Sequence, residues 1–253
     1  MYPVRPGDSN DELRFSLRSL VNVPHGRVWM VGYKPSWVRG VEFIEGGNTD
    51  MPAPRANLYN NLILACQHPG ISDQVLIMND DFYFIGPTRR VPVLFRGPLA
   101  EQVATVTQRG GVKGWWQESL MATQRCLAAA GYPDAVSYEL HTPFPCDRGA
   151  LADTLQRFAG VSPYNPPQWR TLYGNVRQAG GVVGPDVKSL RPGPIHRPYH
   201  STDDASWRYF RIRMMEMFPQ PSPYEHHTTD ARSLVNVSPR SHPKAARRAR
   251  VVN

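Results

Sequence analysis

Cysteine is scarce in this chain of 253 residues, and the three that occur, Cys66, Cys126 and Cys146, lie far apart. An odd, widely spaced set excludes a disulfide framework and a cysteine zinc cluster, and it is typical of a reducing compartment. Long apolar runs are also lacking, since no stretch reaches the roughly 18 residues of a membrane span. The first residues lack the apolar core of a signal peptide. We therefore expect a cytoplasmic protein without a membrane span.

Several catalytic signatures are missing as well. The sequence has no P-loop, no G-x-G-x-x-G, no G-x-S-x-G and no Cys/His zinc spacing, and no hydrolase triad can be assembled from it. Proline, in contrast, is plentiful. Most of the 25 prolines lie from Pro133 onward, which predicts a second half rich in loops and extended segments.

The chain is basic, with a net charge of +8 and an isoelectric point of about 9.6. Part of this charge lies in a tail, residues 236–253, which has five Lys and Arg and no acidic residue. Such a tail binds nucleic acid or anionic surfaces, or it is simply a solvated, flexible end. A cleft that binds phosphate groups would also favour basic residues, so charge alone does not identify the partner.

Residues 75–84 carry the most informative pattern in the sequence. Four apolar residues predict a short buried strand, three polar residues (Asn79, Asp80 and Asp81) stop it, and an aromatic run follows. Two adjacent carboxylates at the end of a buried strand repel each other and lose hydration, a cost that a divalent cation commonly offsets. The pattern therefore favours a metal-assisted nucleotide site at the carboxyl end of a strand. A tight turn is the plainer alternative, since Asn and Asp favour turns.

Hydrophobic spacing places the other elements. Apolar residues from Leu13 to Val21 follow one face of a helix, for which residues 8–10 supply N-cap candidates. We predict strands at 28–31, 41–44 and 136–141, and further helices at 55–67, 98–108, 115–130, 147–158 and 207–218. A strand–helix–strand order implies crossover connections. The expected fold is α/β, with a mainly parallel central sheet and a helical, loop-rich second half, in one domain (residues 1–235) before the tail.

Three further groups offer candidate chemistry, each with a plainer alternative. Arg5 and Asp8 precede the first helix, where a phosphate would meet the helix N-terminus, but a surface pair plus a cap fits equally. His141 ends an apolar run and can serve as base, acid or metal ligand, although a lone histidine is more often structural. Asp203 and Asp204 form a second acidic pair, which also suits the start of the helix at 207–218.

Ordered blocks of sequence run through most of positions 4–225. Residues 10–20 read NDELRFSLRSL and residues 78–82 read MNDDF. These blocks look like the NELRYSLRS and LNDDxF blocks of the Stealth family of sugar-phosphate transferases, and the chain also resembles the smaller phage relatives of that family, which are commonly called glycosyltransferases. The resemblance is specific in the first half and loose in the second. Shorter similar blocks lie at 27–31, 35–38, 69–72, 141–148, 201–204 and 218–225.

The resemblance implies a compact, GT-A-like nucleotide-diphospho-sugar transferase, phage-encoded and acting in the host cytoplasm. It implies a divalent metal, Mn²⁺ or Mg²⁺, and a nucleotide-sugar donor, with a UDP-sugar favoured. Stealth proteins open with a VYTWVDG-like block that supplies acidic residues to their site, whereas only residues 2–5, YPVR, precede the first helix here. Two reactions therefore stay open, transfer of the sugar itself and transfer of the sugar 1-phosphate.

This interpretation assigns roles to individual residues. Asp81, assisted by Asp80, is predicted to hold the metal on the donor diphosphate. His141 is the candidate acceptor base or a sugar-phosphate contact, and Asp203 is a second acidic contributor. Asn57 is placed by its match to the asparagine of the family's FNS block. The predicted donor-binding residues are Arg5, Asp8, Arg14, Asn57, Asn79, Asp80, Arg170 and Asn175.

The acceptor is open between a modified base in phage DNA and a virion protein, and the oligomeric state is open too. For DNA, Lys113, Trp115 and Trp116 would add a basic and aromatic surface, although a Trp pair opening a helix is more often core. A third hypothesis is a non-catalytic, basic nucleic-acid-binding module. It accounts for the charge but for none of the ordered blocks.

Overall fold

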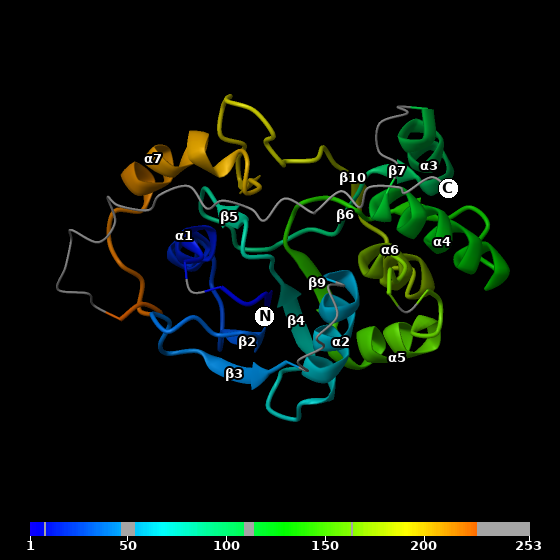
Figure 1. Cartoon of the computed structure of the whole chain (residues 1–253), viewed down its shortest axis with the longest axis horizontal. Coiled ribbons are helices and arrows are strands. Elements are labelled where there is room, and N and C mark those ends of the chain that lie inside the picture. The colour runs from blue at the N-terminus through cyan, green and yellow to red at the C-terminus, as the bar shows by residue number, and fades with distance from the viewer. Residues whose placement is uncertain (8, 47–53, 109–113, 163, 227–253) are drawn as a thin grey trace, which may run out of the picture.

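The computed structural model describes residues 1–7, 9–46, 54–108, 114–162 and 164–226. It shows a mixed α/β fold with strands between two groups of helices (Figure 1). Helices α1 (Asp11–Ser19) and α7 (Trp207–Met217) lie at one end. Helices α3 (Leu99–Gln108), α4 (Trp115–Ala129), α5 (Arg148–Phe158) and α6 (Trp169–Val176) lie at the other.

The central sheet begins with three parallel strands in the order β1 (Tyr2–Val4), β2 (Trp29–Gly32) and β3 (Glu42–Glu45). Two backbone hydrogen bonds continue this row to β4 (Gln74–Ile77). The Met1 amino group donates to the Leu76 carbonyl at 2.8 Å, and the Met78 amide donates to the Met1 carbonyl at 2.9 Å. On its other edge β4 pairs antiparallel with β9 (Phe144–Asp147). The strands therefore lie side by side in the order β3, β2, β1, β4 and β9.

Three shorter pairings complete the strand set. Strand β5 (Phe82–Phe84) pairs antiparallel with β11 (Tyr199–Ser201), and β7 (Gly97–Pro98) pairs antiparallel with β8 (Val136–Ser137). Strand β6 (Leu94–Phe95) pairs parallel with β10 (Val182–Val183). A 3₁₀ turn, η1 (Leu20–Asn22), follows α1. The predicted parallel arrangement thus holds for β1–β3. The antiparallel pairs join strands that are far apart in the sequence. The strand–helix–strand order of the first half predicts parallel neighbours only for strands that follow one another, so it could not predict the direction of these pairs.

Helix α1 forms as its sequence predicts. The Asn10 side chain accepts from the Leu13 amide at 2.9 Å and so caps the helix, and Asp11 and Glu12 lie in its first turn, near the positive end of the helix dipole. Leu13 and Leu17 are fully buried in a core cluster with residues of β1 and β2. The apolar face of α1 therefore fixes this helix over the start of the sheet.

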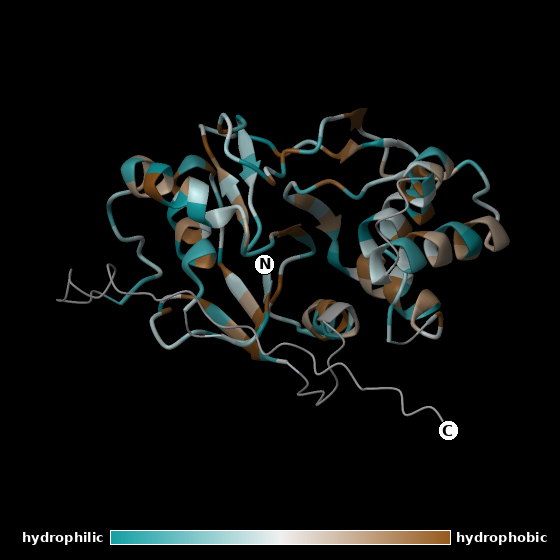
Figure 2. Cartoon of the chain, turned by 45° about the horizontal axis from the view of Figure 1, so that its top comes forward, coloured by the Kyte–Doolittle hydropathy of each residue, from teal (hydrophilic) through white to brown (hydrophobic). Residues whose placement is uncertain are grey.

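The second half is built around a separate apolar cluster. It joins α2 (Pro54–Gln67) to α4, α5 and α6 through fully buried leucines: Leu62, Leu120, Leu127, Leu151, Leu155 and Leu172. In Figure 2 the helices of the second half carry both brown apolar and teal polar residues, as amphipathic helices do. In the described part of the chain, no helix is both long and apolar enough to cross a membrane.

Two predicted boundaries need correction, and several elements were not predicted, among them the short strands β6, β7, β9, β10 and β11. The strand expected at 136–141 is limited to β8, because the amides of Tyr138 and Glu139 bond to the Thr171 and Ser137 hydroxyls instead of a neighbouring strand. The helix expected at 207–218 ends at Met217. Neither β1 nor α6 was predicted. Helix α6 contains Gly174, where a Cβ atom would approach the Tyr138 ring to 2.3 Å, so this glycine allows close packing rather than ending the helix.

Candidate functional site

The predicted acidic pair, Asp80 and Asp81, lies at the point where the strand order of the sheet reverses. From β1 the chain passes through α1 to β2 on one side, whereas β4 lies against the other side of β1. Asn79, Asp80 and Asp81 follow the carboxyl end of β4. The Asn10 side chain, at the start of α1, donates to Asp80 Oδ2 at 2.8 Å and so joins the two strand ends. Open α/β sheets bind ligands at such a switch point.

Asp81 is a largely buried carboxylate whose oxygens are poorly paired. Its side chain is 14% exposed. Oδ2 accepts from Lys188 Nζ at 3.5 Å and from the Ser201 hydroxyl at 3.4 Å, and buried Oδ1 has no hydrogen-bond partner in the part of the chain that the structure describes. Burial raises the pKa of Asp81, and the Lys188 charge opposes that rise. Such an under-satisfied carboxylate is costly in the cation-free protein and suits a hard cation.

Glu12 adds a third carboxylate that the sequence analysis did not single out. The Thr202 hydroxyl donates to Glu12 Oε1 at 2.5 Å, and Thr202 also bonds to the Tyr83 hydroxyl at 2.9 Å. Burial raises the pKa of Glu12 to about 8, and the charges of Asp81 and Asp80 act in the same direction. Glu12 lies inside the block at 10–20, two residues after Asn10, so its place on the first turn of α1 was the available signal.

The raised pKa of Glu12 predicts a specific dependence of stability on pH. Because its folded-state pKa of about 8 exceeds the ordinary value of 4.5, its contribution to stability is complete below pH 4.5 and is lost as the pH rises through 8. In chelator, the melting temperature of wild-type protein should fall over this range, and Glu12→Gln should flatten that part of the curve. Differential scanning fluorimetry from about pH 5 to about pH 9, the span of this titration, measures both.

The matched control for this pH experiment is Glu101→Gln, which changes an exposed glutamate on α3. Its melting curve should follow the wild type at every pH. A Glu12→Gln protein with the wild-type slope would show that Glu12 titrates normally in the folded state.

Arg170 and Asn79 are brought together as predicted donor-site residues. Arg170, on α6, donates from Nη2 to Asn79 Oδ1 at 3.1 Å, and its guanidinium carbon lies 5.6 Å from the centroid of the Phe82 ring. The residue is only 7% exposed, and its Nε has no partner among the described residues. Burial lowers the pKa of Arg170, while Glu139 and Asp81 oppose this. A guanidinium remains charged in proteins, so Arg170 supplies fixed positive charge beside the acidic pair.

His141 forms a pair with Asp186 that the sequence did not reveal. His141 Nδ1 lies 3.0 Å from both carboxylate oxygens of Asp186. Asp186 also accepts from Arg96 Nη2 at 2.7 Å and from the backbone amides of His141 and Lys188, both at 3.2 Å. Burial alone would raise the pKa of Asp186, but the hydrogen bond and charge of His141, with Arg96, bring it well below its usual value. The ionised carboxylate places the proton on Nδ1 and leaves Nε2 as the basic nitrogen.

The His141–Asp186 pair lies close to the acidic pair. The His141 ring meets the Phe82 ring edge-on at a centroid separation of 6.5 Å, and its charge lowers the pKa of Asp81. His141 is partly exposed, with 34% of its side chain accessible. A base held by a carboxylate, beside a buried and under-paired acid and partly open to solvent, is an arrangement suited to proton abstraction from an incoming hydroxyl.

Other predicted residues lie at the rim of this cluster. Arg5 Nη2 pairs with Asp204 Oδ1 at 2.9 Å, and both side chains are about two-thirds exposed, at 68% and 65%. Asp203 Oδ1 accepts from the Ser206 amide at 2.8 Å in the turn before α7. This contact matches the plainer alternative, in which Asp203 serves the start of this helix. Burial would raise the pKa of Asp203, but the Ser206 hydrogen bonds and the Lys188 charge lower it. The field of Lys188 therefore reaches Asp81 and Asp203 together.

Two predicted donor-binding residues have other partners. Arg14 Nη1 donates to Glu225 Oε2 at 2.9 Å and its guanidinium lies 4.1 Å from the centroid of the Trp37 ring. The Asn175 side chain bonds to the backbone N–H and C=O of Val136 at 2.9 and 2.8 Å, which holds β8 against α6. We therefore leave Arg14 and Asn175 out of the proposed site.

The remaining predictions concern residues outside the cluster. Asn57 lies in the first turn of α2, half-buried. Trp115 opens α4 and is 49% exposed, whereas Trp116 packs against the core of the second half. Asp8, Lys113 and the tail at 236–253 lie outside the described residues.

A cation at this site would rely on few protein ligands. Among the described residues, no group of three or more His, Cys, Asp or Glu is arranged to hold a metal ion. Mg²⁺ and Mn²⁺ are commonly held by one or two carboxylates, with water and substrate phosphates completing the shell. The orphaned Oδ1 of Asp81, with the neighbouring carboxylate of Asp80, fits that smaller donor set.

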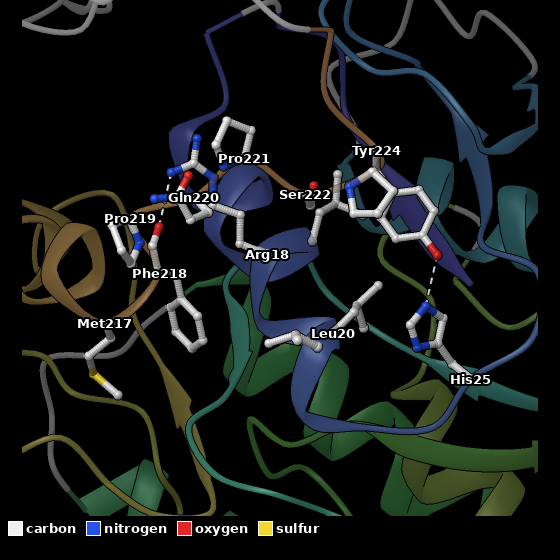
Figure 3. Close-up of a pocket in the computed structure, with 13 residues that line it drawn as sticks. Arg18, Leu20, His25, Met217, Phe218, Pro219, Gln220, Pro221, Ser222 and Tyr224 are labelled. Carbon is white, nitrogen blue, oxygen red and sulfur yellow. Dashed lines mark hydrogen bonds between the residues drawn. The ribbon is translucent and has the colours of Figure 1, made fainter.

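An apolar groove of about 410 Å³ lies elsewhere on the molecule (Figure 3). It is bounded by α1, η1 and the proline-rich segment 217–224, and it shares no residue with the acidic cluster. Its polar features include Arg18, Gln220 and Ser222, and a 2.8 Å hydrogen bond joins His25 Nε2 and the Tyr224 hydroxyl. Arg18 donates to Glu225 and to the Phe218 carbonyl, so this side chain serves the fold.

Comparison with known proteins adds no assignment to this geometry. A scan against protein-family models finds no match, and a search of curated proteins finds none either. The Stealth resemblance therefore stays a prediction, and any function must be argued from the cluster around Asp81.

Proposed function

We propose that the protein is a metal-assisted transferase that uses a nucleotide-sugar donor. The observation that carries the proposal is Asp81, a buried carboxylate with an unpaired oxygen at the switch point of the sheet. Arg170 and the His141–Asp186 pair lie beside it, so a candidate cation ligand, fixed positive charge and a candidate base occur together. These are the groups that transfer from a nucleoside diphosphate requires.

The donor half of the site consists of Asp81, Asp80 and Arg170. Asp81 and Asp80 would hold a divalent cation, which supplies Lewis-acid neutralisation of the leaving diphosphate when bound. Arg170, fixed on Asn79, contributes positive charge beside them. Arg5 is exposed at the rim and free to exchange Asp204 for a phosphate, since exposed ion pairs are weak.

The acceptor half of the site is His141 with Asp186. Asp186 holds the ring so that Nε2 can take a proton from an acceptor hydroxyl as that hydroxyl attacks. Attack at the anomeric carbon transfers the sugar and releases the nucleoside diphosphate. Attack at the β-phosphorus transfers the sugar 1-phosphate and releases the nucleoside monophosphate. We place sugar transfer first and keep sugar-1-phosphate transfer, the Stealth-type reaction, as the alternative.

Sequence and fold support the proposal at different levels. The resemblance of residues 10–20 and 78–82 to Stealth blocks favours a GT-A-like transferase of phage type. The mixed α/β fold with a parallel three-stranded sheet is compatible with that fold family. Residues from both blocks meet in the hydrogen bond between Asn10 and Asp80.

A thermal-shift panel of nucleotide sugars tests the proposal. A ligand present at about 100 times its dissociation constant adds roughly 2.7 kcal/mol of apparent stability. We expect a shift with one donor, UDP-sugars first, that requires Mn²⁺ or Mg²⁺ and disappears in chelator. The mass of the product formed with an acceptor then separates the two reactions, which differ by one phosphate.

The opposite result has a clear meaning. Folded protein that shows no shift with any donor would overturn the transferase proposal. Binding to DNA that weakens steeply with salt would then favour the basic nucleic-acid-binding module, for which the net charge of +8 is the supporting observation.

A further inference from the structure

The Lys188 ammonium group lies beside the Asp81 carboxylate, the same acid that would hold the proposed cation. Its Nζ lies 3.5 Å from Asp81 Oδ2, and both side chains are largely buried, with exposed fractions of 20% and 14%. Its positive charge is also felt by Asp203. Lys188 was not among the residues that the sequence pointed to, and the role of His141, Arg170 and Asp80 does not require it.

The contact between Lys188 and Asp81 is a poor one for two opposite charges. Charge-assisted N–H···O bonds are typically about 2.7–2.9 Å long. An ammonium group has three donors, yet among the described residues Asp81 is the one acceptor within hydrogen-bond reach of Nζ. Asp81 also keeps one oxygen unpaired. Each group therefore retains bonding capacity that the other does not satisfy.

The backbone holds Lys188 at this place while its side chain stays adjustable. The segment around Lys188 forms a parallel bridge with Ser201, and the Ser189 amide donates to the Ser201 carbonyl at 2.9 Å. The Lys188 amide donates to Asp186 Oδ1 at 3.2 Å. The chain is thus fixed between β11 and the His141–Asp186 pair, and only the four-carbon stem is left to move the ammonium group.

We propose that Lys188 is the counter-ion of Asp81 in the cation-free protein and passes to the donor's diphosphate when a divalent cation binds Asp81. The inference rests on the proposed function, and it names a nucleoside diphosphate group as the ligand of Lys188. A divalent cation and an ammonium group repel each other, so binding of the metal at Asp81 displaces Lys188. The displaced charge would need an anion, and the diphosphate of the donor would supply it. Cation and diphosphate then bind with positive coupling through Lys188.

The test is the variant Lys188→Met, which keeps the length of the side chain and removes its charge. Isothermal titration calorimetry measures the affinity for Mn²⁺ alone. It then measures the affinities for UDP and for GDP at saturating Mn²⁺. We expect Mn²⁺ alone to bind more tightly to the variant, because its competitor for Asp81 is gone. We expect the nucleoside diphosphate to bind more weakly. Couplings of this kind are typically about 5- to 150-fold, and we expect changes within that range.

Opposite signs in the two titrations distinguish this role from a purely structural one. Loss of packing or folding would weaken both affinities together, and that outcome overturns the inference. So does unchanged Mn²⁺ affinity, or unchanged nucleoside diphosphate affinity, in the variant. Lys188→Arg, which restores the charge, should return both affinities toward the wild-type values. Lys34→Met removes the charge of an exposed lysine and should change neither.

The wild-type titrations separate this inference from the proposed function. Protein that binds no Mn²⁺ and no nucleoside diphosphate contradicts both. Protein that binds both, together with a Lys188→Met variant that behaves like the wild type, leaves the proposed function standing and overturns the inference alone.

Discussion

Asp81→Asn is expected to abolish cation binding and transfer while making the cation-free protein more stable. Asparagine has the same shape but no charge, so it removes the ligand and also the cost of a buried, under-paired carboxylate, a cost that burial imposes even with the Lys188 charge beside it. Loss of one preorganised electrostatic group costs on the order of 10²- to 10³-fold in turnover, and we expect at least that loss. Calorimetry with Mn²⁺ and a transfer assay measure the functional change.

The stability change has the sign that the pKa of Asp81 dictates. Because burial raises that pKa in the folded protein, the favourable contribution of the protonated carboxyl is present below the unfolded-state pKa and lost as the pH rises. Wild-type protein near neutral pH therefore carries a cost that the amide lacks. Each 1 kcal/mol recovered raises the melting temperature by roughly 2–4 °C in a chain of this size.

Asp153→Asn, at an exposed position of α5, is the control for Asp81→Asn and should change neither stability nor binding. An Asp81→Asn protein that still binds Mn²⁺ and turns over donor would remove Asp81 from the site. A lower melting temperature in chelator would show that the Asp81 carboxylate stabilises the fold instead of costing it stability.

Glu225→Ala is expected to cost about 3–5 kcal/mol of unfolding free energy, the usual effect of removing one partner of a buried ion pair. Glu225 is 1% exposed, and its carboxylate accepts from Arg14 at 2.9 Å and from Arg18 at 2.8 Å. It also accepts from the amide and hydroxyl of Ser222. Alanine would leave two guanidinium groups without their counter-ion. Urea unfolding, followed by far-ultraviolet circular dichroism, measures the loss.

The pH dependence of Glu225 runs opposite to that of Asp81. Burial alone would raise its pKa, but the hydrogen bonds and charge of Arg18, with Ser222 and Arg14, hold it below the ordinary 4.5. Its contribution to stability is therefore present above pH 4.5 and lost as the pH falls through the folded-state value. Wild-type and Glu225→Ala proteins should converge in stability in acid. Arg5→Ala, which breaks an exposed pair, is the control and should cost only about 0–1 kcal/mol. A comparably small loss for Glu225→Ala would contradict a stabilising role.

Local sequence rules predicted much of the fold because many elements carry their own signals. Asn10 caps α1 as its position suggests, and the helices at 55–67, 98–108, 115–130 and 147–158 form within a residue or two. Helix α6 was missed because proline and glycine dominate the passage around it. Packing of Trp169, Leu172 and Tyr173 into the second-half core stabilises this short helix, and no local pattern reports that packing.

The residues of the candidate site could be predicted only where they are neighbours in the sequence. Adjacent carboxylates after a buried strand pointed to Asp80 and Asp81, and the structure brings Asn79, Arg170 and His141 to the same region. Asp186 and Lys188 were missed because they lie 45 and 107 residues from the partners they contact, in a passage without periodicity. Arg14 was predicted as a nucleotide contact, but its partner is Glu225. That residue lies 211 positions away, and no local pattern links the two.

The partners of α1 also determine when the site can form. Glu12 meets Thr202 across 190 residues, and Arg14 and Arg18 meet Glu225 across 211 and 207. Contacts over such separations form late, because a long loop must close first. At a synthesis rate of roughly 5–20 residues per second, about 10–40 s pass between the translation of Arg14 and that of Glu225. Through that interval a nascent chain has α1 without its counter-ions, and the acidic pair gains its neighbours from residues 186–202 only after those residues have been translated.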